Sequence, residues 1–190
     1  GSNDGTLLNL YTNKFKRYGV DPTAKKFKKF YQKDIQVIPK IFKNNIFNKN
    51  IKFKIITAVA MFYDLRNPIG FCRQIEKNLD REGVFHVEVA YLPDILKLFS
   101  FDTFCQEHLT YFSFTSFNYL INQTNLKIID YHRNKINGGS INFDIVFKSS
   151  KHKPKEKKLR LLRNQENKLG INNSRIYKRF YKELINKANE

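Results

Sequence analysis

The chain has 190 residues, of which 41% are hydrophobic and 27% charged, a balance that is typical of a globular domain and excludes a disordered one. Its formal net charge of +18 comes mainly from lysines scattered among many Asn and Ile residues, which A/T-rich codons explain, so we expect no nucleic-acid partner. The distant Cys72 and Cys105 exclude a C-x-x-C zinc ribbon and favour a reducing, cytoplasmic setting, and no apolar run is long enough to span a membrane.

The first part of the chain alternates helix and strand signals. Pro22 disfavours a helical conformation at the preceding Asp21 and so ends a short strand, and Thr23 is a suitable residue to cap the next helix. The predicted elements are, in chain order, a turn at 1–5, a helix at 6–11, a strand at 17–20, a helix at 23–30, a strand at 35–38 and a weak helix at 41–47.

The same alternation continues after residue 51. A near-continuous apolar run that includes Ile55, Ile56 and Val59 is typical of a strand buried on both faces. Asn67 is a suitable cap for the following helix, with Pro68 at its first position. The predicted elements are a strand at 52–61, a helix from 68, strands at 83–89, 126–131 and 140–147, and a helix at 115–122. Two exposed, lysine-rich helices with thin apolar stripes follow at 154–170 and 174–189.

Strands that alternate with helices predict an α/β fold with a mainly parallel sheet. Ligands of such sheets bind beyond the carboxyl ends of the strands. The turn at 1–5, Asp21 and Asp64 fall at such ends, while Glu88 fits a site residue and a cap of the following loop equally well. The character of the sequence changes after residue 150, which predicts a main domain at 1–150 and a helical extension at 151–190.

The turn at residues 1–5 and Asp21 have the character of a nucleotide site. Glycines let a ligand approach the backbone closely, and the N-terminus of the following helix offers free N–H donors. Asp21 lies 20 residues after Gly1, at the end of the next predicted strand, where α/β folds place an acid on ribose hydroxyls. Together these features favour an adenosine-type ligand.

A Glu–His pair interrupts the aromatic-rich segment at residues 101–113. Histidine titrates near neutral pH and a neighbouring carboxylate can orient or charge it, so Glu107 and His108 form a candidate acid–base unit. The residue pattern alone fits a solvent-facing turn equally well.

Several motifs, in this order and spacing, resemble one family. They are G-S-N-D-G-T-L-L at 1–8, G-V-D-P-T at 19–23, T-A-V-A-M-F-Y-D-L-R-N-P at 57–68, E-V-A-Y-L-P at 88–93, S-F-D-T-F-C-Q-E-H-L-T-Y-F-S at 100–113 and N-G-G-S-I at 137–141. From residue 1 to about residue 170 the chain resembles the S-adenosylmethionine-dependent sugar C-methyltransferases, which act on nucleotide-linked 4-keto-hexoses. The resemblance implies a Rossmann-like class I methyltransferase domain with a mainly parallel sheet and an antiparallel final strand.

The resemblance also implies roles for particular residues. His108 would remove the proton α to the sugar ketone, with Glu107 assisting, and Cys105 stands where some members carry a substrate-contacting Tyr. Tyr91 and Tyr111 are candidate substrate-side aromatics, for which core packing is the plainer interpretation. The S-adenosylmethionine site would comprise Gly1, Asn3, Asp4, Gly5, Asp21 and Asp64, the last standing where some members carry a His.

Full members of that family have further parts. The resemblance places zinc only in an N-terminal Cys-rich module, and a C-terminal domain grips the nucleotide of the sugar. We therefore expect a fragment that lacks the first strand of the sheet and holds no metal. Two alternatives stay open: a basic module that binds nucleic acid or another anion, and an inactive remnant of a methyltransferase.

Overall fold

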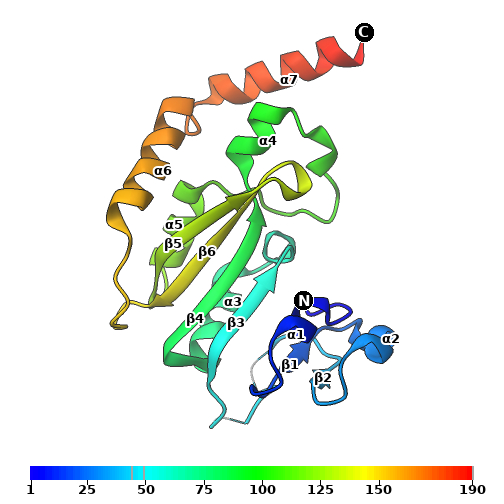
Figure 1. Cartoon of the computed structure of the whole chain (residues 1–190). Coiled ribbons are helices and arrows are strands. Elements are labelled where there is room, and N and C mark those ends of the chain that lie inside the picture. Colours follow the sequence, from blue (N-terminus) through cyan, green and yellow to red (C-terminus); the bar gives the residue numbers. More distant parts are fainter. Residues whose placement is uncertain (44, 49, 190) are drawn as a thin grey trace. The chain divides into compact units, whose positions relative to one another are not determined.

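The computed structural model describes residues 1–43, 45–48 and 50–189. The chain forms two compact units, Gly1–Ile51 and Lys52–Glu190, each with its own β-sheet (Figure 1). The predicted α/β class and the predicted alternation of helix and strand are confirmed in both units. The domain boundary that the sequence predicts at residue 150 stays a prediction.

The first unit is built around two short parallel strands. It comprises α1 (Thr6–Leu10), β1 (Tyr18–Val20), α2 (Ala24–Phe27), the 3-10 helix η1 (Lys28–Phe30) and β2 (Gln36–Ile38). Gly19 of β1 lies opposite Val37 of β2, and Ala24, Tyr31 and Ile35 form the buried core. The core is small, so polar contacts have a large share in holding this unit together.

Arg17 makes the principal polar contacts of the first unit. Its side chain is buried, and one guanidinium nitrogen donates to the carbonyl oxygens of Leu8 and Tyr11, at 3.1 and 2.7 Å. The other terminal nitrogen donates to Asp34 at 2.6 Å. These bonds tie the C-terminal end of the short helix α1 to Arg17 and Asp34, in addition to the bond that the Tyr11 N–H donates to the Leu8 carbonyl oxygen.

The second unit is a four-stranded sheet in the order β3-β4-β6-β5. β3 and β4 are parallel, and β6 is antiparallel to both of its neighbours, β4 and β5. Three strands therefore share one direction, and the prediction that the final strand is antiparallel is confirmed. The strands are β3 (Phe53–Val59), β4 (Leu79–Ala90), β5 (Leu126–Asn134) and β6 (Ser140–Phe147).

Five α-helices accompany this sheet in the described part of the second unit. They are α3 (Pro68–Asn78), α4 (Leu92–Leu98), α5 (Phe114–Asn122), α6 (Glu156–Leu169) and α7 (Ser174–Ala188), with 3-10 helices η2 (Phe62–Asp64), η3 (Phe101–Thr103) and η4 (Ile136–Gly138). Asn67 caps α3 as predicted, because its side chain accepts a hydrogen bond from the Gly70 N–H at 2.8 Å. Among the described residues, no helix combines the length and hydrophobicity that crossing a bilayer requires.

The core of the second unit is rich in aromatic side chains. Phe117 of α5 stacks on Phe143 of β6, with ring centroids 4.7 Å apart, and Phe62 lies 5.3 Å from Phe117. All three rings are fully buried. A Ser113–Ser116 capping box fixes the start of α5 and so holds Phe117 against the sheet.

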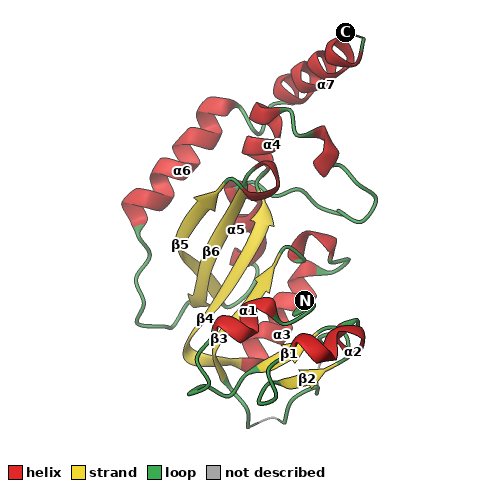
Figure 2. Ribbon diagram, turned by 45° about the vertical axis from the view of Figure 1, so that its right-hand side comes forward, coloured by secondary structure: helices red, strands yellow, loops and turns green. Residues whose placement is uncertain are grey.

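Two sequence predictions are wrong. The described residues of 41–47 form no helix, and Asn44 lies outside the described residues. Strand β3 is covered on one face only within its unit: Ala58 is buried, whereas Ile55 is 53% exposed. The helix predicted at 154–170 corresponds to α6, which is mostly exposed; its narrow apolar stripe buries Leu159 and Leu162, and it lies along β5 (Figures 1 and 2).

Candidate functional site

A cavity lies at the carboxyl ends of the parallel strands β3 and β4. Its volume is about 200 Å³, and its wall is formed by the end of β4, the segment that follows β3, the segment around η3 and the first residue of β6. Ala60, which directly follows β3, has a left-handed backbone with φ of 51°, a strained conformation for a residue other than glycine. The lining residues are Ala60, Tyr63, Glu88, Val89, Ala90, Asp102, Thr103, His108 and Ser140.

His108 lines this cavity with one ring nitrogen already engaged. Its Nδ1 lies 2.8 Å from the carbonyl oxygen of Thr103. A carbonyl oxygen only accepts hydrogen bonds, so Nδ1 carries the hydrogen, and the neutral ring keeps its lone pair on Nε2. The arrangement therefore holds the imidazole in the tautomer in which Nε2 can accept a proton.

Tyr63 and its backbone hold the His108 segment in place. The imidazole packs edge-on against the Tyr63 ring, with centroids 4.4 Å apart. The N–H groups of Leu109 and Thr110 both donate to the Tyr63 carbonyl oxygen at 3.1 Å. The sequence singled out His108, but nothing in it marked Tyr63 or Thr103 as supports, because the contacts are a ring packing and backbone hydrogen bonds that only the fold creates.

Two other predicted site residues, Glu107 and Asp64, lie close to His108 without forming a hydrogen bond with it. Glu107 is exposed, and none of the described residues forms a hydrogen bond or ion pair with its carboxylate. Asp64 is also exposed. The pKa of Asp64 is raised, chiefly because its carboxyl group is partly shielded from water. The nearby His108 opposes this increase, and the negative charge of Glu107 adds to it. The structure thus brings Asp64 near the predicted base.

The three residues predicted to face the substrate differ in position. Cys105 is exposed, and the Tyr111 hydroxyl donates to the Thr103 carbonyl oxygen at 3.3 Å, the same acceptor that His108 uses. Tyr91 is 2% exposed, is not part of the cavity wall, and donates its hydroxyl to Glu166 at 2.8 Å. Burial and the Glu166 charge raise the pKa of Tyr91.

In the first unit, the turn at residues 1–5 is fixed by Asp21 and Tyr31. The Asn3 N–H donates to Asp21 Oδ2 at 3.0 Å, and the Tyr31 hydroxyl donates to the Asn3 carbonyl oxygen at 2.7 Å. Gly5 has φ of +81°, and a Cβ there would lie 2.6 Å from the Tyr31 ring. Only glycine fits this position, because any other side chain would collide with the ring of Tyr31. The sequence did not single out Tyr31.

The other predicted residues of this turn are close to its backbone. Asp4 accepts a hydrogen bond from the Thr6 N–H at 3.0 Å, which lowers its pKa, and Gly1 donates to the Val20 carbonyl oxygen at 2.9 Å. Asp21 Oδ1 accepts from the N–H and hydroxyl of Thr23, at 2.7 and 2.6 Å. Burial raises the pKa of Asp21, but these bonds and the one from Asn3 outweigh it and lower the net value. Asp21 is therefore an ionised acceptor at neutral pH.

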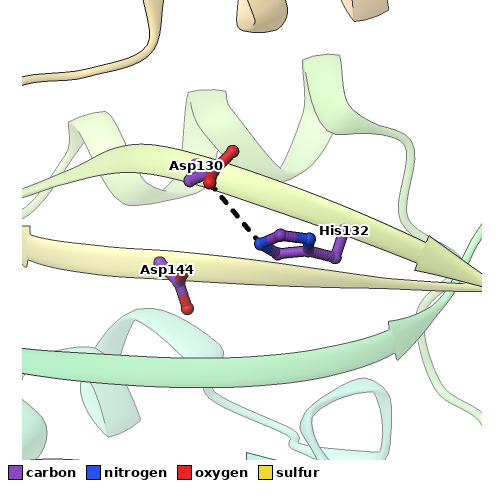
Figure 3. A group of neighbouring side chains, drawn as sticks. All are labelled: Asp130, His132 and Asp144. Atoms are coloured by element: carbon purple, nitrogen blue, oxygen red, sulfur yellow. Dashed lines mark ion pairs between the residues drawn. The ribbon is translucent and has the colours of Figure 1, made fainter.

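A second group of titratable side chains lies on strands β5 and β6. Figure 3 shows Asp130 and His132 on one strand and Asp144 on the other, with the His132 Nε2 3.5 Å from Asp130. Such a set resembles a metal site. Lys155 and Lys158, however, each donate to an oxygen of Asp130 at 2.6 Å. The two ammonium groups already neutralise this carboxylate, which disfavours a cation there.

This pairing predicts a loss of stability in acid. Burial raises the pKa of Asp130, but the hydrogen bonds from Lys155 and Lys158 outweigh it and lower the pKa to about 2. The folded chain therefore favours the ionised form of Asp130. Its contribution to stability is fully present above the pKa that this group has in the unfolded chain, and it is lost as the pH falls toward 2. We expect this group to cost about 1–2 kcal/mol of unfolding free energy between pH 5 and pH 2.

Urea unfolding at several pH values, followed by circular dichroism, measures this effect. The stability gap between the unmodified chain and Asp130→Asn is expected to narrow steadily below pH 4. A gap of the same size at pH 5 and pH 2 contradicts the assignment.

Comparison with known proteins places the chain beside methyltransferases, although no family model matches it. It is 30% identical over 146 residues to the C-methyltransferase NovU of Streptomyces niveus, an alignment that covers 74% of the chain and 35% of NovU. The chain thus spans about a third of the length of this curated relative.

Solved structures agree in fold. A chain of the complex between the Haloferax volcanii Trm112 methyltransferase activator and a putative methyltransferase matches with a TM-score of 0.64 and 13% identity, over 77% of this chain and 80% of that one. The plantazolicin methyltransferase BpumL, in complex with a triazolic desmethylPZN analogue and SAH, matches with a TM-score of 0.59 and 11% identity, over 77% of this chain and 74% of that one. The chain therefore has the α/β fold of class I S-adenosylmethionine-dependent methyltransferases.

Proposed function

We propose that this chain is part of an S-adenosylmethionine-dependent C-methyltransferase that acts on a nucleotide-linked keto-sugar. The relation to a curated C-methyltransferase supports the reaction class, and the fold shared with methyltransferases agrees with it. The observation that carries the proposal is the state of His108, a cavity residue whose Nδ1–H is committed to the Thr103 carbonyl oxygen.

In the proposed reaction, Nε2 of His108 takes the proton from the carbon next to the sugar ketone. Carbon methylation at this position requires such a step, because the C–H carbon becomes a nucleophile only as an enolate. Imidazole is the side chain that most often serves as a general base in such steps. Glu107, adjacent in sequence, is proposed to assist by its negative charge, and Cys105 and Tyr111 to contact the substrate.

The first unit is proposed to hold the cofactor. The donor set fits: Asp21 is an ionised acceptor suited to ribose hydroxyls, and the turn at residues 1–5 presents backbone groups next to a glycine with left-handed geometry. Gly1, Asn3, Asp4 and Gly5 would line the cofactor. When bound, S-adenosylmethionine supplies an electrophilic methyl group on a sulfonium, which needs no metal. BpumL, a protein of the same fold, was crystallised with SAH.

Isothermal titration of the whole chain with S-adenosylmethionine tests the cofactor assignment. We expect saturable binding to the unmodified chain and an affinity about tenfold to a hundredfold lower for Asp21→Asn, since a hydrogen bond to a charged group is worth about 1.5–3 kcal/mol. Asp34→Asn is the matched control, because Asp34 is an exposed acid of the same unit whose partner is Arg17. Equal affinities for the two variants, or no binding by the unmodified chain, would refute the assignment.

A further inference from the structure

Glu88 lies near the carboxyl end of β4, an inner strand of the sheet. Strand β4 alternates: Phe85, Val87 and Val89 are buried on one face, and Glu88 points to the other. The residue lies opposite Val59 of β3 and Asn142 of β6 and lines the cavity that also contains His108. Its side chain is therefore half-buried on a rigid strand and not on a mobile loop.

The carboxylate of Glu88 has one side-chain partner among the described residues. Asn134 donates from Nδ2 to Glu88 Oε2 at 3.1 Å. The Asn134 amide has a fixed orientation, because its oxygen accepts the Ile136 N–H at 2.9 Å. No Lys, Arg or His of the described residues pairs with Glu88. A half-buried charge with one neutral donor keeps unused acceptor capacity, which another hydroxyl donor can fill.

Tyr63 offers the complementary group in the same cavity. Its side chain is 8% exposed, and none of the described residues hydrogen-bonds its hydroxyl. Burial raises its pKa, and the negative charges of Asp64 and Glu88 raise it further, so the hydroxyl stays protonated and can donate. The cavity therefore presents the Glu88 carboxylate, whose acceptor capacity Asn134 fills only in part, and the Tyr63 hydroxyl, which no described residue engages.

The size of the cavity limits what these groups can hold. About 200 Å³ is less than the roughly 300–1,000 Å³ of pockets for drug-sized ligands. It provides room for one ring-sized polar group and not for a whole nucleotide.

We propose that Glu88 is a substrate-positioning residue that accepts a hydrogen bond from a ring hydroxyl of the sugar, with Asn134 orienting the carboxylate and the Tyr63 hydroxyl donating to the same ring. This inference rests on the proposed function, because it assigns a sugar ring to the cavity of His108. It also assigns a specificity: a substrate without that hydroxyl leaves a half-buried carboxylate unpaired, and sites of this kind reject deoxy analogues strongly.

Titration of the chain with a nucleotide-linked 4-keto-hexose, and with the same nucleoside diphosphate without the sugar, tests the proposal. We expect Glu88→Gln to weaken binding of the sugar nucleotide about tenfold or more, and Asn134→Ala to weaken it less. Binding of the sugar-free nucleotide and of S-adenosylmethionine is expected to stay unchanged. The matched control is Glu82→Gln, because Glu82 lies in the same strand but binds Ser150 and Lys151 outside the cavity.

The outcomes separate this proposal from the proposed function. If Glu88→Gln binds the sugar nucleotide as tightly as the unmodified chain, or if the unmodified chain does not bind it, Glu88 has no such role. Exchange of the substrate α-proton with solvent deuterium reports independently on His108. An unmodified chain that binds the sugar through Glu88 but catalyses no exchange would overturn the proposed reaction and leave the binding role intact.

Discussion

Replacing His108 with alanine is expected to lower the rate of α-proton exchange in a nucleotide-linked 4-keto-hexose by about 10²- to 10⁴-fold, the usual contribution of a general base. The physical reason is that His108 Nε2 is the acceptor nitrogen held next to the cavity. Proton magnetic resonance in deuterated water measures the exchange directly, without dependence on methyl transfer. Affinity for S-adenosylmethionine is expected to be almost unchanged.

Two further variants make this experiment specific. His108→Asn keeps a side-chain N–H near the Thr103 carbonyl oxygen but removes the base, so it should be as inactive as the alanine variant. His132→Ala removes an exposed histidine outside the cavity and should exchange at the normal rate. Exchange by His108→Ala at a rate near that of the unmodified chain would show that another group is the base.

Replacing Glu166 with alanine is expected to lower the unfolding free energy of the second unit by about 3–5 kcal/mol. Glu166 lies in α6, is 1% exposed, and accepts the Phe114 N–H at 2.6 Å and the Thr115 N–H at 2.9 Å, at the start of α5. It also accepts the hydroxyls of Thr115 and Tyr91. Without the carboxylate, these donors are left unpaired where water does not reach them, and α5 loses a negative charge at its N-terminus.

Chemical unfolding measures this loss, with Glu183→Ala as the control. Glu183 lies on α7, and its exposed ion pair with Arg179 is worth less than about 1 kcal/mol. Glu166→Gln retains one oxygen acceptor and should fall between the two. A change below about 0.5 kcal/mol in Glu166→Ala would mean that α6 is an appendage, as a boundary at residue 150 suggests, and not part of the packed unit.

The fold was predictable where local chemistry decides it. Asn67 and Pro68 mark the start of α3, and Asp21–Pro22 marks the end of β1. The burial of β3 was not predictable, because an apolar run such as the one around Ile55 does not reveal whether a second layer covers it. Likewise, the role of α6 depends on Glu166, a charged residue that sequence patterns assign to the surface.

Some residues of the candidate site could also be predicted from the sequence, and others could not. The sequence predicted Asp21 from its place at a strand end, 20 residues after Gly1, and His108 from the Glu–His pair together with the family resemblance. It did not identify Thr103, whose contribution is a backbone carbonyl oxygen, or Tyr31, whose ring fills the space that Gly5 leaves. Such supports depend on tertiary contacts between residues whose own types carry no functional signal.

The hydrogen bond between His108 and the Thr103 carbonyl oxygen has a consequence for the dynamics of proton transfer. The donor on Nδ1 is the same in the neutral imidazole and in the imidazolium, so the bond survives both protonation states. Uptake and release of a proton at Nε2 therefore require no ring flip and no exchange of partners. If His108 acts as the proposed base, each proton transfer requires little reorganisation of this side chain, because Nδ1 keeps the same partner throughout.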